Sequence, residues 1–384
     1  MRLFSWPGIV AVEGHDRVIL ARFERPVRVL STCPRHGGMR EDLVALYNHQ
    51  SCEPAGHGGE VMSYLATHQR AEHDRLCASH GVDPDLTASL GTAASMRCAG
   101  VATRSFDDLR VTAVCTAGVE GNAGRAGDPA SVVEVDGRYD RVAEHQQPEH
   151  GTINTMVFVN HELTSGATAR ALMNATEAKS AVLQDLVVGS RYSCGRATGT
   201  GTDQYALACP IGVGTPLHSA GHHVVLGELV SQAVAGALRD ALVLQNGLEP
   251  SSRRSVSAQL ARFGVTLPLL VERAQQDLAP REAALLAENI RCLDADPLVV
   301  AAVAGLAEVV DQVTAGILPA SRAQEYAAWG GALIAAAVAA GEANVQELRS
   351  QLEGEDLAPD SLVPKAFAVG YALKWRSLHS RLSG

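Results

Sequence analysis

The sequence predicts an α/β (α+β) layered domain with a mixed sheet and packed helices, followed by an all-α C-terminal domain. Up to about Leu244, short runs rich in β-formers alternate with glycine-rich polar loops and a few helical patterns. After the breaker QNGLEPSSRRS at 245–255, alanine and leucine recur with helical periodicity, and prolines stand near the expected helix starts. We therefore expect two domains, residues 1–247 and 256–384.

Each element of this prediction has its own pattern. Runs of β-branched and apolar residues predict strands at VRVLST, LVALYN, RVTAVCTAG, TINTMVFVN and QYALAC. Apolar residues three and four apart predict helices at 59–76, 166–186 and 222–243, and within ADPLVVAAVAGLAEVV and LPASRAQEYAAWGGALIAAAVAA. A chain of 384 residues with 46% hydrophobic residues is long enough to give each domain a core.

Charge and composition exclude several classes of function. The formal charge of −10 without a basic run argues against nucleic acid or anionic lipid as a partner. The N-terminus lacks the pattern of a secretory signal, and the longest later apolar run, 333–340, is too short to span a bilayer. We therefore expect a soluble cytoplasmic protein that binds neither nucleic acid nor membrane.

The eight cysteines are scattered without CxxC pairs, which disfavours a zinc site and a disulfide scaffold. We expect mostly reduced, buried thiols, with Cys33 beside Arg35 and His36 as a minor candidate nucleophile. Familiar hydrolase motifs are missing: His161-Glu162 begins an HExxH pattern that Ser165 breaks, and no GxSxG occurs. No metal ligands are predicted.

The stretch ATGTGTD at 197–203 is the most unusual loop. Its glycines permit tight turns with uncovered N–H groups, and Thr198, Thr200 and Thr202 add hydroxyl donors, so the loop could bind an anion or an amide. Asp203 would then serve as base, metal ligand or anchor. The alternative is an Asx-type turn before the strand QYALAC.

A second glycine-rich loop, TAGVEGNAGRAGDP at 116–129, carries Asn122, Arg125 and Asp128. It is too long for a simple hairpin, and it matches neither a Walker A loop nor a dinucleotide fingerprint. Nucleotide binding is therefore not indicated. The loops CPRHGG, HGTINT, NHELTSG and SAGHH are further candidates, because several loops of this domain follow predicted strands, where α/β proteins build their sites.

The helix expected at 165–186 has an unusual lysine. At 100° per residue, Lys179 is centred on an otherwise apolar stripe, so it must snorkel, pair with a carboxylate or occupy a polar cavity. Asn174 and Glu177 fall on the opposite, polar stripe. A Thr176/Lys179 dyad has the right spacing, but a mid-helix threonine more often bonds back to its own helix.

Two histidines, His222 and His223, are expected to open the helix at 222–243, which also contains Glu228. Offsets of five and six residues place the histidines and this glutamate on different faces of the helix. A metal site shared among these three side chains is therefore not expected.

Taken together and in order, GG at 37–38, TAGVEGNAGRAGD, GTIN, NATEAK, ATGTGTDQ and GHHVVLGELVSQAV resemble the adenosylcobinamide amidohydrolase family (CbiZ type) from about Val29 to Leu244. The resemblance implies hydrolysis of the amide between aminopropanol and the corrin ring of adenosylcobinamide, giving adenosylcobyric acid in corrinoid salvage. It leaves activity on pseudo-cobamides open. The cobalt-containing corrinoid is the substrate, no cofactor is certain, and the need for a metal stays open.

Amide hydrolysis needs an activated water, stabilisation of the oxyanion and a proton for the leaving amine. From this chemistry we predict Asp203, Glu177 and Lys179 as catalytic residues. The predicted substrate-binding residues are Asn122, Asp128, Thr152, Asn154, Thr198, Thr200, Thr202 and His222.

Rival interpretations remain at this level. The chain could be a corrinoid carrier or sensor that binds without hydrolysis, or an amidohydrolase with another substrate. The C-terminal domain shows no clear phosphatase motif, so an oligomerisation or regulatory role, with a possible homo-oligomer, is the simplest expectation.

Overall fold

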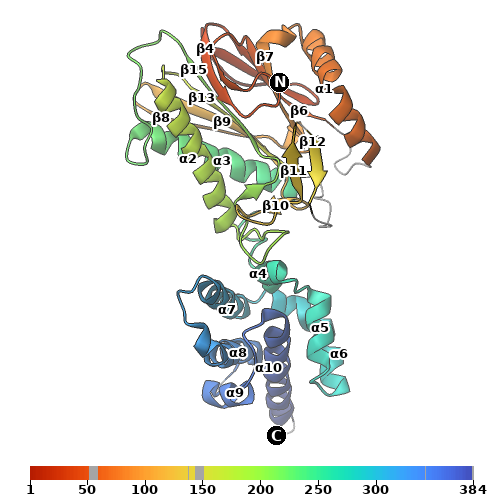
Figure 1. The fold of residues 1–384 in the computed structure, drawn as a ribbon. Coiled ribbons are helices and arrows are strands. Elements are labelled where there is room, and N and C mark those ends of the chain that lie inside the picture. Colours follow the sequence, from red (N-terminus) through yellow and green to blue (C-terminus); the bar gives the residue numbers. More distant parts are fainter. Residues whose placement is uncertain (52–58, 137, 143–150, 342, 383–384) are drawn as a thin grey trace. The chain divides into compact units, whose positions relative to one another are not determined.

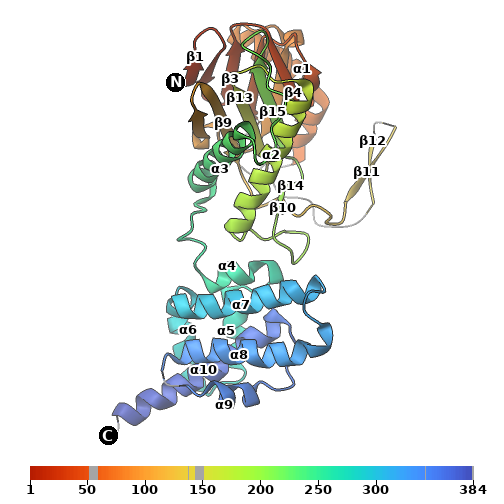
Figure 2. The same ribbon diagram turned by 90° about the vertical axis from the view of Figure 1, so that its left-hand side faces the viewer.

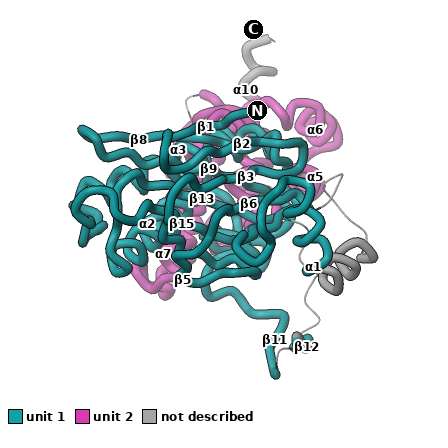
Figure 3. The backbone as a smooth tube through the Cα atoms, turned by 90° about the horizontal axis from the view of Figure 1, so that it is seen from above, with its two compact units in different colours: residues 1–249 teal, residues 250–384 magenta. Residues whose placement is uncertain are grey.

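The computed structural model describes residues 1–51, 59–136, 138–142, 151–341 and 343–382. The chain divides into two compact units, Met1–Glu249 and Pro250–Gly384, which Figure 3 colours separately. The first unit combines two β-sheets with helices and the second consists of helices. The predicted fold class is thereby confirmed.

One sheet of the first unit has five strands in the order β1-β2-β3-β6-β7. Neighbouring strands in this sheet are antiparallel except for β6 and β7. These two are parallel because helix α1 crosses over between them. The elements are β1 (Arg2–Trp6), β2 (Val10–Gly14), β3 (Val18–Phe23), β6 (Ala45–Gln50), α1 (Gly59–His80), the 3-10 turn η1 (Pro84–Leu86) and β7 (Thr87–Thr92). The sequence analysis did not anticipate the strands β1, β2 and β3.

The other sheet has six strands in the order β5-β4-β15-β13-β9-β8. Its only parallel pair among the described strands is β13 with β15, and helix α2 connects these two. The elements are β4 (Val27–Ser31), β5 (Gly38–Arg40), η2 (Met96–Cys98), β8 (Gly100–Phe106), β9 (Leu109–Ala117), β13 (Ile153–Val159), α2 (Ser165–Asp185), β15 (Gln204–Pro210) and α3 (Val225–Asn246).

The two sheets and three helices form four layers. Val10, Val12 and Ile19 of the first sheet pack against Met156 and Phe158 of the second. On the far face of the second sheet, strands β9, β13 and β15 pack against α2 and α3, and α1 covers the outer face of the first sheet. Figures 1 and 2 show α2 and α3 side by side over β9, β13 and β15.

Helices α2 and α3 run in the same direction. Asn174 on α2 lies beside Gly227 in the first turn of α3, and Asp185 at the end of α2 pairs with Arg239 further along α3. The end of α3 reaches the loop after β9, where the Asn246 side chain accepts a hydrogen bond from Val119 N.

Two small antiparallel ribbons complete the first unit. One joins β10 (Ala123–Gly124) to β14 (Gly199–Thr200). The other joins β11 (Val132–Val135) to β12 (Arg138–Arg141), and Figure 2 shows this hairpin reaching away from the layered sheets. The first ribbon matters for function because it connects the two glycine-rich loops.

The second unit has its own core. Its elements are α4 (Val256–Leu260), η3 (Ala261–Phe263), α5 (Leu267–Gln275), α6 (Pro280–Asp294), α7 (Pro297–Thr314), η4 (Ala320–Arg322), α8 (Ala323–Ala339), α9 (Val345–Gln351) and α10 (Pro359–Leu382). Prolines occupy the first turns of α5, α6 and α7, where their missing N–H costs no helical hydrogen bond.

By length and composition, α7 is long and apolar enough to cross a membrane, whereas the sequence analysis considered 333–340, within α8, as the longest apolar run. The criterion is weak, because core helices of soluble proteins also meet it.

Candidate active site

Most family-like loops meet at one edge of the six-stranded sheet. Strand β9 is antiparallel to β13, β13 is parallel to β15, and β15 is antiparallel to β4. The ends of β4 and β9 therefore lie beside the beginnings of β13 and β15. We call residues 32–38, 117–128, 151–152 and 197–203 at this edge the loop edge. Residue 150 lies outside the described residues.

The expectation that the loops follow strands is only partly right. Residues 151–152 and 197–203 precede β13 and β15, while NHELTSG and SAGHH leave the opposite ends of these strands. An antiparallel neighbour reverses the direction of a strand, so loops before one strand can meet loops after another. The loop edge is built in this way.

Asp203 is a bound carboxylate at the centre of the loop edge. Its Oδ1 accepts hydrogen bonds from Ile153 N at 3.1 Å and Thr200 Oγ1 at 2.6 Å. Its Oδ2 accepts from Thr200 N at 3.1 Å and from Lys179 Nζ. A carboxylate offers about four acceptor positions for hydrogen bonds, so these four donors occupy all of them. This geometry favours the anchoring role over the role of base.

Lys179 therefore pairs with a carboxylate, one of the three alternatives that its place on an apolar stripe left open. Its side chain is 7% exposed and that of Asp203 is 9% exposed. The ammonium also lies 5.7 Å from the centroid of the Tyr205 ring. Gly199 leaves room for the pair, because a Cβ at this position would overlap both charged groups.

Of the four threonines predicted to bind substrate, three use their hydroxyl hydrogens in hydrogen bonds within the protein. Thr200 donates to Asp203, and Thr202 donates to Gly151 O while lying 2.6 Å from the Thr152 hydroxyl. Thr198 differs, since its Oγ1 accepts from Ala126 N at 2.8 Å. Among the described residues, no acceptor is found for its hydroxyl hydrogen, so Thr198 can donate to a ligand.

Asn122 and Asp128 hold the second glycine-rich loop in place. The Asn122 amide donates to Gly151 O at 3.0 Å and accepts from the Tyr192 hydroxyl at 2.7 Å. Asp128 accepts from Arg125 N and Ser190 Oγ. Burial by itself raises the pKa of the Asp128 carboxyl, but hydrogen bonds from Ser190, Ser193 and Arg125 outweigh it and lower the pKa.

Asn154 is not placed to bind substrate directly. Its side chain is fully buried between the two sheets, where Nδ2 donates to Asn48 Oδ1 at 2.8 Å and to Gly91 O at 3.0 Å. Asn48 in turn donates to Thr116 Oγ1 at 2.8 Å. Asn154 therefore ties the sheets together beneath the loop edge.

Glu177 and His222 form a pair on the exposed side of α2. Glu177 Oε2 lies 2.6 Å from His222 Nε2, and the side chains are 47% and 53% exposed. Helix α3 begins only at Val225, so His222 and His223 belong to the preceding loop and do not open the helix as predicted. The two members of this pair were predicted separately.

Ser180 connects this pair to the loop edge. It lies three residues after Glu177 on α2, and its Oγ is 3.0 Å from Thr198 O. Ser180 and Tyr192 were missed by the sequence analysis. The only sequence signal for Ser180 was its position directly after the NATEAK motif, and Tyr192 stands in a loop without a recognisable pattern.

The structure supports neither of the two minor alternatives, the Thr176/Lys179 dyad and the Cys33 nucleophile. Thr176 donates to Leu172 O within its own helix, and Lys179 is engaged by Asp203, so they form no dyad. Burial raises the pKa of the Cys33 thiol to about 11, so the neighbouring Arg35 and His36 do not activate it.

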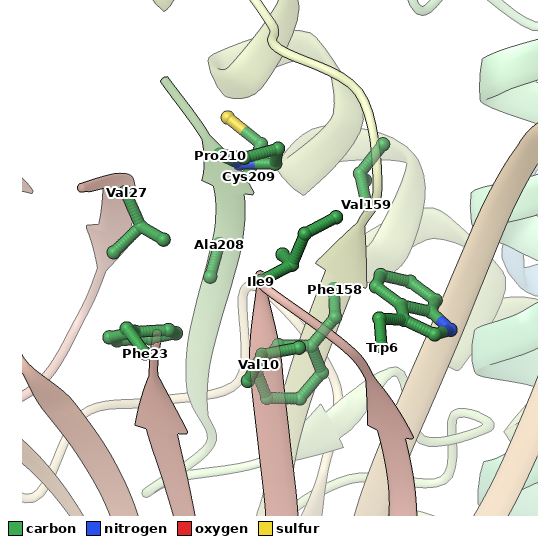
Figure 4. A pocket seen from close by; sticks show the side chains of 10 residues that line it. All are labelled: Trp6, Ile9, Val10, Phe23, Val27, Phe158, Val159, Ala208, Cys209 and Pro210. Atoms are coloured by element: carbon green, nitrogen blue, oxygen red, sulfur yellow. The ribbon is translucent and has the colours of Figure 1, made fainter. Parts of the chain in front are cut away.

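Within the described residues, neither a metal site nor an apolar pocket competes with the loop edge. Among the described residues, no group of three or more His, Cys, Asp or Glu side chains is arranged to hold a metal ion. Figure 4 shows an apolar pocket at the opposite ends of β13 and β15, lined by Trp6, Ile9, Val10, Phe23, Val27, Phe158, Val159, Ala208, Cys209 and Pro210. Its volume of about 10 Å³ is at the limit for one water molecule.

Glycine-rich loops with an available hydroxyl donor, beside an exposed histidine–carboxylate pair, are suited to hydrolysis of an amide. Comparison with known proteins identifies the substrate class. Residues 8–250 match the adenosylcobinamide amidohydrolase family, CbiZ. Since the match covers more than half of the chain, the protein belongs to this family of corrinoid-salvage enzymes, and the resemblance seen from the sequence is confirmed.

Two further similarities accompany this match. The uncharacterised protein MJ1613 of Methanocaldococcus jannaschii is 30% identical over 256 residues, which are 65% of this chain and 95% of that protein. The solved structure of the PH0078 protein from Pyrococcus horikoshii OT3 covers 63% of this chain and 82% of that chain with 11% identity. Its TM-score of 0.29 is too low to establish a shared fold.

Proposed function

We propose that the exposed side of α2 and the adjoining loop edge form the site where this amidohydrolase cleaves adenosylcobinamide, with His222 as the general base. One observation carries the proposal: Glu177 Oε2 lies 2.6 Å from His222 Nε2 on the same helix that contacts the Thr198 backbone through Ser180. The base and the segment that carries the hydroxyl donor are thereby held by the same helix.

The choice of His222 follows from comparing the available bases. The Asp203 carboxylate is filled by four donors and nearly buried, whereas Glu177 and His222 are both open to water. A carboxylate that holds one ring nitrogen of a histidine orients the ring and leaves the other nitrogen to accept a proton. Glu177 is therefore assigned to orienting His222.

Thr198 is assigned to the carbonyl oxygen of the scissile amide. Its hydroxyl has a hydrogen to donate, and the β10–β14 ribbon together with Ser180 fixes its backbone. A fixed donor stabilises the negative charge that develops on the oxygen, because it needs no rearrangement during the reaction. Thr202 is exposed and offers a contact for the amide-fringed corrinoid, and the buried Asn122 and Thr152 hold the loops beneath it.

The Lys179–Asp203 pair is assigned to positioning. It fixes the loop that carries Thr198, because Asp203 accepts from two backbone N–H groups on different segments. Neither member touches the reacting amide in this proposal. Two of the three residues that the sequence analysis proposed as catalytic, Asp203 and Lys179, thus act through the loop they anchor.

The chemical step balances with water as the only co-reactant. His222 accepts a proton from a water molecule, and the water oxygen adds to the amide carbon while Thr198 donates to the oxyanion. The bond between carbon and nitrogen then breaks, and the imidazolium returns the proton to the nitrogen of aminopropanol. The products are aminopropanol and adenosylcobyric acid.

The test is turnover of adenosylcobinamide by purified variants, followed by chromatography and mass spectrometry of both products. We expect His222→Asn to lower kcat roughly 10²- to 10⁴-fold, the contribution of a general base. Thr198→Val should lower kcat roughly 10²-fold, the value of one oxyanion donor.

The matched controls are His223→Asn, next to His222, and Glu228→Gln, an exposed carboxylate on α3. Both are expected to keep kcat within about twofold of the original enzyme. Full turnover by a folded His222→Asn variant would remove the base from the proposal. Binding of adenosylcobinamide without turnover by the unmodified protein would leave a corrinoid carrier.

A further inference from the structure

Asn174 occupies a position that helix packing alone does not explain. Its place on the polar stripe of α2 predicted exposure, yet its side chain is fully buried against the segment that leads into α3. Nδ2 donates to Ala220 O at 2.6 Å, and within the described part of the chain Oδ1 has no hydrogen-bond partner. Burying an amide oxygen without a donor costs free energy, so the role of this asparagine lies in the hydrogen bond that its Nδ2 donates to Ala220 O.

The carbonyl that Asn174 holds belongs to the segment that ends at His222. Gly227 lies beside this contact, because a Cβ there would overlap Gly221 O and lie 2.6 Å from Ala220 O and 2.7 Å from Asn174 Nδ2. The backbone of residues 220–221 thus packs against the Asn174 amide and against a glycine that leaves room for both. Val224 N donates to Gly221 O, which turns the chain into α3.

His222 is therefore fixed at two levels by α2. Asn174 holds the backbone two residues before His222, and Glu177, three residues after Asn174, contacts the imidazole ring itself. This arrangement links two separate family-like motifs, NATEAK and GHHVVLG. The first motif supplies the amide and the carboxylate, and the second supplies the histidine and the glycine.

We infer that Asn174 is a positioning residue for His222, which sets the distance and direction of the imidazole relative to the scissile amide. This inference rests on the proposed base role of His222. In the free enzyme Asn174 touches only the protein, so its loss should reduce kcat and leave KM nearly unchanged. Gly227 supports the same position, because its missing side chain leaves room for the Asn174 amide and the Ala220 carbonyl.

The experiment combines turnover of adenosylcobinamide with chemical modification of the full-length protein. Asn174→Ala is expected to lower kcat roughly tenfold, a part of what a general base contributes. Diethyl pyrocarbonate should modify His222 several-fold faster in this variant, because the ring is released from Glu177. Peptide mass spectrometry measures this rate, with His223 in the same peptide as internal reference.

Two further variants separate positioning from a general loss of structure. Thr168→Ala removes another fully buried polar group of α2, one that donates to Thr164 O rather than to residues 220–222, and should leave the His222/His223 modification ratio unchanged. Gly227→Ala places a Cβ against Gly221 O, Ala220 O and Asn174 Nδ2, so it disturbs the same contact and should reproduce the Asn174→Ala signature, even if one of the two variants folds poorly.

A double-mutant cycle distinguishes the failure of this inference from failure of the base role. Asn174→Ala should cause no further loss of kcat in a His222→Asn background. An unchanged modification ratio, or an equal loss of kcat in both backgrounds, overturns the positioning role while His222 remains the base. Full activity of His222→Asn alone refutes the base role, and the positioning role with it.

Discussion

At the scale of single residues, Asp203 shows that a carboxylate in a family-like motif can act as a structural anchor, with its acceptor positions all occupied. Two backbone N–H groups, one hydroxyl and one ammonium surround it. Its value lies in joining the start of β13, the ATGTGTD loop and α2 at one point. Gly199 belongs to the same arrangement, since any larger residue there would displace the Lys179 ammonium and the Asp203 carboxylate.

The buried ion pair of Lys179 and Asp203 leads to a prediction about stability. Lys179→Met should lower the free energy of unfolding by about 3–5 kcal/mol, because it leaves a nearly buried carboxylate without its cation. Asp203→Asn should also destabilise, and the double variant should lose less than the sum of the two. Urea unfolding at neutral pH measures all three. The exposed pair of Asp185 and Arg239 is the control, since Asp185→Asn should cost less than about 1 kcal/mol. Strictly additive effects would refute the coupling.

His49 gives a prediction about pH. Burial is the main cause that lowers its pKa from 6.5 to about 4, against a smaller opposing effect of Glu72. A group with a lowered folded pKa binds fewer protons in the folded state, so stability falls as the pH drops from about 6.5 to about 4. The loss amounts to about 3 kcal/mol at most.

His49→Gln should remove this part of the pH dependence. The measurement is urea unfolding of both proteins at several pH values between 7 and 4. If the variant loses stability as steeply as the original protein over this range, His49 is not the group responsible.

At the scale of elements, the close packing of α3 on β8 depends on a glycine. A Cβ at Gly100 would overlap Ala237 O and lie 2.8 Å from Ala241 N, both backbone atoms of α3. Gly100→Ala should therefore destabilise the protein by about 3 kcal/mol or more, since backbone atoms cannot yield as a side chain does. Thermal unfolding tests this prediction. Gly91→Ala, a strand glycine with open space around its Cβ position, should have little effect.

The strands and helices also show which parts of the fold can be predicted from the sequence. Strands β4, β6, β9, β13 and β15 and helices α1, α2 and α3 were expected within a few residues, because their patterns are local. Strands β1–β3 were overlooked. The loop edge was only partly foreseen, since strand pairing decides which loops meet, and that pairing is set by contacts between distant segments.

The same limit applies to the candidate site. Lys179, Asp203, Glu177 and His222 were each singled out by residue type and context, but their pairing was not. Asn174 was assigned to an exposed stripe because helix angle alone cannot show which neighbour covers a face. Asn154 was expected at the substrate and lies instead between the sheets.

At the scale of the whole molecule, each unit has its own hydrophobic core. The family match ends at residue 250, and MJ1613 aligns along 95% of its length with 65% of this chain. We therefore expect a shortened protein ending at Glu249 to fold and to release aminopropanol from adenosylcobinamide at a rate within a few-fold of the full chain. Loss of folding or activity on truncation would show that the helical unit supports the first.

The parallel course of α2 and α3 has an electrostatic consequence. Each helix carries a macrodipole whose negative end is its C-terminus, and α3 ends at the loop edge, where Asn246 contacts Val119. The fields of the two helices therefore add in one direction instead of cancelling. An adenosylcobinamide, with trivalent cobalt bound by a monoanionic corrin and an alkyl ligand, is a cation, and the chain has a formal charge of −10. We therefore expect electrostatic attraction between the substrate and the enzyme, so kcat/KM should decline as added salt screens it.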